Sequence, residues 1–184
     1  VRFIARNYYN EPNRKDIKIL ELGCGTGANL WFMSREGFSV TGVDGSNVAI
    51  DKAKKRMKKN SLDVDIFQND VMNLPFDNAY FNCVIDIECI YANSLADSKI
   101  IIGEVFRVLK NDGGFFSKTF STGMRGENTA IKLEGEPYTY LEMPDGPLRN
   151  DYGIIRLTDE NEIPQLYKKF AEVHYDYIVR SDLN

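Results

Sequence analysis

The stretch at residues 19–28 has the residue types of a nucleotide-type cofactor site. An apolar run ends at Glu21 and Leu22, and Gly23, Gly25 and Gly27 follow at every second position. Glycine lets a chain turn sharply and approach a ligand closely, because it carries no Cβ. The carboxylate just before the glycines adds a hydrogen-bond acceptor for a ligand donor. The stretch therefore predicts a cofactor-binding loop and leaves open which cofactor it serves.

One alternative is a dinucleotide. Gly23, Gly25 and Ala28 satisfy the G-x-G-x-x-G/A fingerprint, and Asp44 follows near the spacing of about 20 residues that a ribose-binding acid has. Glu21 opposes this interpretation, because its carboxylate would repel a pyrophosphate and would favour a cationic ligand instead. The chain also lacks a Tyr-x-x-x-Lys pattern for hydride transfer. An NAD-dependent oxidoreductase is therefore the second hypothesis.

Apolar patterning shows which elements position these residues. It predicts strands at residues 17–22, 39–43, 64–68, 81–87 and 115–119, and helices at 28–36, 46–59 and 95–109. Residues 111–114 predict a turn. Strands that alternate with helices indicate a parallel sheet with right-handed crossovers. The predicted fold class is α/β, with a doubly wound, mostly parallel sheet.

Acidic residues stand at or near the carboxyl ends of four of these strands: Glu21, Asp44, Asp70 and Asp86. Ligands of an open α/β sheet bind beyond those ends. Acceptors at these points suit a ligand that carries several hydrogen-bond donors. One such acid alone would be interpreted as a surface carboxylate, but several at successive strand ends indicate a site.

These acids, the glycine run and the ending at residues 106–114 resemble the class I S-adenosylmethionine-dependent methyltransferases, in particular their small-molecule branch. The resemblance is close over residues 17–119. It implies a Rossmann-like sheet of seven strands, the last antiparallel, and methyl transfer from S-adenosylmethionine to a small-molecule acceptor, with S-adenosylhomocysteine as product and no metal. The cofactor-binding residues that it implies are Glu21, Gly23, Gly25 and Gly27 at the amino-acid end, Asp44 and Gly45 at the ribose, Asp70 and Val71 at the adenine, and Asp86 facing cofactor and substrate.

The catalytic group is harder to name, because methyl transfer from a sulfonium needs a base only where the acceptor loses a proton. Glu88 follows the fourth strand and is the first candidate for a base or a substrate contact. His174 is the only histidine and is the second candidate.

Periodicity fails at residues 120–152, which are rich in Gly, Pro, Glu and Tyr. We expect this stretch to be an irregular substrate-side insertion within a single domain that spans residues 1–184. Candidate substrate contacts are Tyr91, Tyr138, Tyr140, Arg149 and Tyr152. A helix at 160–170 and a strand at 173–179 are predicted next. No segment then remains for the antiparallel seventh strand, so we expect either a longer chain or a sheet completed in another way.

Composition limits the remaining classes of function. The net charge of −4 argues against nucleic-acid binding, and no apolar run approaches the roughly 20 residues of a membrane span. Three cysteines without a C-x-x-C pair predict structural thiols in a reducing, cytoplasmic setting. The expected partner is a small-molecule substrate, and the oligomeric state stays open. A third hypothesis is a protein that binds the cofactor without turnover.

Overall fold

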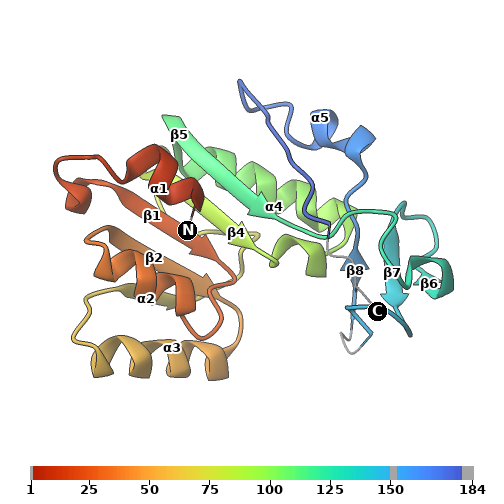
Figure 1. Ribbon diagram of the computed structural model, residues 1–184, viewed down its shortest axis with the longest axis horizontal. Coiled ribbons are helices and arrows are strands. Elements are labelled where there is room, and N and C mark those ends of the chain that lie inside the picture. Colours follow the sequence, from red (N-terminus) through yellow and green to blue (C-terminus); the bar gives the residue numbers. More distant parts are fainter. Residues whose placement is uncertain (1, 150–152, 180–184) are drawn as a thin grey trace.

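The computed structural model describes residues 2–149 and 153–179 (Figure 1). Its main sheet has five parallel strands in the order β3-β2-β1-β4-β5. The strands are β1 (Lys18–Leu22), β2 (Ser39–Asp44), β3 (Asp65–Gln68), β4 (Phe81–Ile87) and β5 (Leu109–Lys118). The order reverses direction at β1 and β4, as in a doubly wound sheet. The predicted α/β fold class is confirmed.

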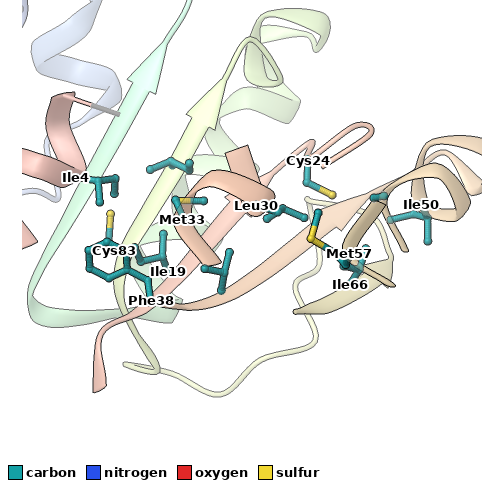
Figure 2. Packing of buried hydrophobic residues seen from close by; sticks show 13 residues of the cluster. Ile4, Ile19, Cys24, Leu30, Met33, Phe38, Ile50, Met57, Ile66 and Cys83 are labelled. Atoms are coloured by element: carbon teal, nitrogen blue, oxygen red, sulfur yellow. The ribbon is translucent and has the colours of Figure 1, made fainter. Parts of the chain in front are cut away.

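Helices cover both faces of the sheet. One face carries α1 (Arg2–Tyr8), α2 (Ala28–Arg35) and α3 (Asn47–Lys59), and the other carries α4 (Leu95–Val108). Residues from the first three helices and the strands beneath them form one buried cluster (Figure 2). The hydroxyls of Ser46 and Ser94 cap α3 and α4 by accepting from the backbone N–H groups three residues on. Both helix starts agree with the sequence pattern.

The turn predicted at residues 111–114 is wrong, because these residues belong to β5. Phe81 of β4 pairs with Leu109, and Cys83 pairs with Gly114. The residues between Leu109 and Gly114 therefore bulge out of the ladder, with Asn111 and Asp112 exposed. The Asn-Asp-Gly-Gly sequence produces a bulge that interrupts the pairing without ending the strand.

Two strands of a second, antiparallel sheet lie in the stretch predicted to be irregular, and its third strand follows that stretch (Figure 1). Its strands are β6 (Ile131–Lys132), β7 (Thr139–Glu142) and β8 (Ile155–Arg156). A separate buried cluster stabilises this sheet, formed by Tyr140, Met143, Leu148, Ile155 and Leu157. The short turn η3 (Glu127–Thr129) precedes the sheet.

The long helix predicted at residues 160–170 is wrong. Only η4 (Glu160–Glu162) and α5 (Ile163–Leu166) form there. After α5 the chain turns, and the backbone N–H of Phe170 bonds to the carbonyl of Tyr167. The ring of Phe170 then packs on Phe115 of β5, with ring centroids 5.8 Å apart. Aromatic packing on the sheet replaces the continuation of the helix.

The strand predicted at residues 173–179 does not form either. Its side chains are exposed, with Ile178 at 79% and Val179 at 86%. A strand needs a neighbour for its N–H and C=O groups, and in the part of the chain that the structure describes no strand pairs with the outer edge of β5. The main sheet therefore has five strands over this range, where the resemblance implied seven. Among the described residues, no helix is both long and apolar enough to cross a bilayer.

Candidate cofactor site and adjoining strand ends

A hollow of about 420 Å³ lies at the carboxyl ends of the first three strands. Its lining includes five residues that the sequence predicted for the cofactor: Gly23, Asp44, Gly45, Asp70 and Val71. It also includes three that the sequence did not single out, Gln68, Asn69 and Cys89. The glycine loop and the ends of β2 and β3 thus meet at one place, as the parallel topology requires.

The three loop glycines all have positive φ but serve different purposes. A Cβ on Gly23 would lie 2.6 Å from the Cβ of Cys89, so the loop packs directly on the segment after β4. A Cβ on Gly25 would meet nothing within 4 Å, which leaves its backbone open to a ligand. Gly27 is the N-cap of α2 and packs on Ala53 of α3. Gly25 thus has open space beside its backbone, although Gly23 is the one of these three glycines that lines the hollow.

Asp44 connects the glycine loop to the start of α3. Its Oδ2 accepts from the backbone N–H of Gly25 at 2.8 Å, and its Oδ1 accepts from Ser46 at 2.8 Å. Each carboxylate oxygen has further acceptor capacity, so Asp44 can also take hydrogen bonds from a diol. The acid predicted to hold a ribose also fixes the loop that would hold the rest of the ligand.

The far side of the hollow is built around Asp70. Its Oδ1 accepts from the backbone N–H of Met72 at 2.8 Å. Asn69 donates its backbone N–H to the carbonyl of Asp44 at 3.2 Å, which joins this segment to β2. Asn69 and Gln68 are polar residues at the end of β3, and that position is the signal that would have identified them from sequence.

Glu21, which the resemblance places at the amino-acid end of the cofactor, is not among the residues that line the hollow. It is 2% exposed and lies beneath α2, where its Oε1 accepts from the side-chain amide of Asn29 at 2.6 Å. Its Oε2 is buried and has no hydrogen-bond partner among the described residues. Burial raises the pKa of Glu21 to about 7. Because Glu21 lies within β1, its side chain points into the layer under the helices.

Asp86 is also placed differently from its prediction, because it is fully buried and does not line the hollow. Its Oδ1 accepts from the backbone N–H groups of Cys89 at 2.8 Å and Ile90 at 3.2 Å. The hydroxyl of Ser117 donates to its Oδ2 at 2.5 Å. Burial raises the pKa of Asp86. Asp86 thus shapes the turn after β4 and holds the 3-10 turn η2 (Ile90–Ala92).

Glu88 lies on that turn, next to the hollow-lining Cys89. Its φ is +61°, and its backbone N–H donates to the carbonyl of Lys118 at 2.9 Å. Its carboxylate forms an ion pair with the ammonium of Lys118 at the end of β5. Tyr91 is nearby in the chain, and its ring packs edge-on against Phe120 with centroids 4.9 Å apart. The structure therefore gives the predicted base a partner that the sequence did not reveal.

Of the other predicted substrate residues, Tyr138, Tyr140 and Arg149 do not line the hollow. Tyr140 is 2% exposed, and its hydroxyl donates to Glu127 at 2.6 Å within the core of the small sheet. Tyr138 and Arg149 are exposed, and Tyr152 lies outside the described residues. His174 is exposed and lies 3.6 Å from Glu172, in the segment predicted as a strand.

The cysteines are free thiols, and burial raises the pKa of each to about 12. Cys24 and Cys83 are buried in the core as predicted, while Cys89 also lines the hollow. Within residues 2–149 and 153–179, no group of three or more His, Cys, Asp or Glu residues is placed to hold a metal ion.

The family model and two relatives that match this chain are all methyltransferases. Residues 19–113, more than half of the chain, match the family model described as a methyltransferase domain. An uncharacterized methyltransferase of Bacillus subtilis is 29% identical over 156 residues, covering 85% of this chain and 60% of the relative. A ubiquinone biosynthesis O-methyltransferase of Pelagibacter ubique is 31% identical over 132 residues, covering 72% of this chain and 53% of the relative. The chain thus spans between half and two thirds of the length of these relatives.

Solved structures show the same fold. A SAM-dependent methyltransferase from Methanosarcina mazei superposes with a TM-score of 0.74 at 22% identity, covering 86% of this chain and 81% of that one. A protein from Pyrococcus horikoshii superposes with a TM-score of 0.70 at 23% identity, covering 91% and 76%.

Proposed function

The chain belongs to the methyltransferase-domain family, and from this premise we propose that it is an S-adenosylmethionine-dependent enzyme that methylates a small-molecule acceptor. The observation that carries the proposal is the bond from Gly25 to Asp44 at the rim of the hollow. This bond brings an open glycine backbone and a carboxylate together. The hollow adds further acceptors at the ends of β2 and β3.

The residues fit the cofactor in chemical terms. Gly23 and Gly25 would offer backbone groups to its amino-acid end, Asp44 would accept from the ribose hydroxyls, and Asp70 and Val71 would contact the adenine. When bound, the cofactor supplies a methyl group on a sulfonium that is already an activated leaving group. The open space at Gly25 supports this fit, since a Cβ built there would meet no protein atom within 4 Å.

The protein's own contribution to such a displacement is alignment of the reactants and exclusion of water. The glycine loop and the turn after β4 are in direct contact, because Gly23 packs on Cys89. Any ligand seated on the loop therefore lies beside the turn that carries Glu88. The acceptor is a small molecule in this proposal. The name of the Pelagibacter relative, a ubiquinone biosynthesis O-methyltransferase, supports that class of acceptor.

The NAD-dependent alternative retains Gly23, Gly25, Ala28 and Asp44 in its favour. Glu21 opposes it less than its sequence position suggested, because that carboxyl is buried beneath α2. The observations that oppose NAD are therefore the family match and the position of Asp70. A binding protein without turnover shares every feature of the hollow, so only catalysis separates it from an enzyme.

Isothermal titration calorimetry with S-adenosylmethionine, S-adenosylhomocysteine and NAD tests the proposal. We expect both sulfur ligands to bind and NAD to fail, and binding of NAD alone would overturn the proposal. Asp44→Ala should weaken binding of the sulfur ligands by about 1–3 kcal/mol, the scale of lost hydrogen bonds to a charged group. Asp51→Ala is the matched control, because Asp51 is exposed on α3 and does not line the hollow. Turnover with an acceptor panel then separates an enzyme from a binding protein.

A further inference from the structure

The ion pair between Glu88 and Lys118 occupies the carboxyl ends of two neighbouring strands, β4 and β5. Glu88 has a φ of +61°, a conformation that few residues other than glycine adopt. The backbone holds it there, because Glu88 donates to the carbonyl of Lys118 and the two following N–H groups donate to Asp86. The turn after β4 is therefore held by hydrogen bonds to Lys118 of β5 and to Asp86 of β4.

The ion pair by itself does not offset the backbone strain at Glu88, which the hydrogen bonds of the turn hold in place. A left-handed conformation costs a non-glycine residue roughly 1–2 kcal/mol, whereas an exposed ion pair contributes about 0–1 kcal/mol. The side chains of Lys118 and Glu88 are 43% and 36% exposed, so their pair belongs to the weak class. Residues that the surrounding structure holds in a strained conformation cluster at functional sites.

The strand register shows what surrounds the pair. Lys118 pairs with Ile87, one residue before Glu88. Lys118 also lies two residues beyond Phe116 on β5 and therefore shares its face of the sheet. Phe116 and Ile87 line a narrow apolar crevice of about 20 Å³ beneath α1 and α2. The pair thus follows this apolar face of the sheet, and Glu88 directly precedes Cys89, which lines the hollow.

We propose that Lys118 binds the oxygen of the methyl acceptor and that Glu88 accepts its proton, so that the acceptor is an acidic hydroxyl, a phenol or an enol. This inference rests on the proposed function and names the acceptor class of the same site. An ammonium group stabilises a developing oxyanion and repels a protonated amine, so the pair favours oxygen over nitrogen.

The step balances in atoms and charge. The acceptor O–H bond breaks and its proton goes to the carboxylate of Glu88. The acceptor oxygen forms a bond to the methyl carbon of S-adenosylmethionine, and the carbon–sulfur bond breaks with its electron pair left on sulfur. The products are a methyl ether and S-adenosylhomocysteine, and Glu88 then releases its proton to water.

A coloured phenol tests the inference without turnover. The protein is saturated with S-adenosylhomocysteine and titrated with 4-nitrophenol at a pH where the free probe is ionised, and binding is followed by the absorbance of the phenolate. We expect Lys118→Met to weaken binding of the phenolate about tenfold or more, the scale of a lost charged hydrogen bond. Lys118→Arg should restore most of the affinity.

Glu88→Gln should have the opposite effect and tighten phenolate binding, because it removes a negative charge beside the oxyanion. Lys110→Met is the matched control, because Lys110 lies near the amino end of β5 and its ammonium contacts Asn82 at 3.0 Å. This variant should bind the probe as the parent protein does.

The possible failures are distinct. Loss of S-adenosylhomocysteine binding by the parent protein would contradict the proposed function itself. Normal binding of that ligand with no nitrophenolate binding, or with equal nitrophenolate binding by the parent and Lys118→Met, would overturn only the acceptor inference. Retained S-adenosylhomocysteine affinity in each variant shows that the variant is folded.

Discussion

The two halves of the carboxyl edge of the sheet are built in different ways. At the ends of β1 to β3, carboxylates are fixed by backbone N–H groups, as Asp44 is by Gly25 and Ser46. At the ends of β4 and β5, backbone N–H groups also fix a carboxylate, that of Asp86, but here a pair of charged side chains is added, because Glu88 and Lys118 bind each other. The first half surrounds the hollow, and the second half lies next to it.

The difference shows how one scaffold can combine a fixed ligand with a changeable one. A substitution cannot remove a backbone N–H or C=O group unless it changes the local conformation. The half at the ends of β1 to β3 therefore suits a cofactor that is the same in every enzyme built on this scaffold. Side-chain pairs can be replaced singly while the strands stay in place, so the β4–β5 half suits specificity. Rigid positioning with variable side chains is how binding residues are commonly arranged on a scaffold.

Gly23→Ala should produce the largest effect of the substitutions that test this contrast. The new Cβ would lie 2.6 Å from the Cβ and Sγ of Cys89, at a φ of +58°. Overpacking and left-handed strain together should destabilise the protein by about 2–4 kcal/mol, measured by urea unfolding. S-adenosylhomocysteine binding should be lost as well, because the loop cannot keep its conformation.

Gly25→Ala separates these two effects. Gly25 has a φ of +51°, and a methyl group added there would meet no protein atom within 4 Å, so only the strain of about 1 kcal/mol should appear in unfolding. Ligand binding should fall as strongly as in Gly23→Ala, because the methyl group faces the approach of the ligand. Equal ligand affinity in Gly25→Ala and the parent protein would show that the backbone at this position does not meet the cofactor.

Glu21→Gln tests whether the buried acid belongs to the cofactor half. The folded state raises the pKa of Glu21 from 4.5 to about 7, so between these values the folded chain binds more protons than the unfolded chain. Stability from this group therefore falls as pH rises through that window and stays low above pH 7. The variant cannot ionise, so it should be more stable than the parent above pH 7 by about 1–3 kcal/mol.

The two proteins should differ little in stability below pH 4.5, as measured by urea unfolding across the pH range. S-adenosylmethionine affinity should change little, because Glu21 does not line the hollow. A large loss of affinity would mean that the carboxylate reaches the cofactor, as the sequence alone suggested.

Much of the main sheet could be predicted because β1, β2 and β4 consist mostly of apolar or β-branched residues and end beside glycine or an acidic residue. The strand at residues 81–87 has the same bounds in prediction and structure. The site was harder, because an acid within a strand and an acid after it look alike in sequence. Glu21 and Asp86 lie within strands and point into buried layers, whereas Asp70 follows β3 and lines the hollow. The alternation of side chains along a strand was the available signal.

The C-terminal part could not be predicted in this way. Strands β6 and β8 have two residues each, too few to show a period. Their pairing depends on a core that joins Tyr140, Met143 and Leu157 from separate segments. Residues 173–179 have the composition of a strand but lack a neighbouring strand among the described residues. Local patterning reports propensity, and pairing depends on distant partners.

Tyr140→Phe should have the smallest effect and tests whether the small sheet is structural. The substitution keeps the ring, which is 2% exposed, and removes the hydroxyl that donates to Glu127 at 2.6 Å. Glu127 also accepts from the backbone N–H of Gly123 at 2.5 Å, so its carboxylate connects Gly123 to Tyr140 of β7. Loss of one bond should destabilise the small sheet by about 1 kcal/mol. Amide hydrogen exchange should speed up around β7 while cofactor affinity and acceptor KM stay unchanged. A raised acceptor KM with unchanged exchange would instead make Tyr140 a substrate residue and would extend the side-chain-built half of the site into the small sheet.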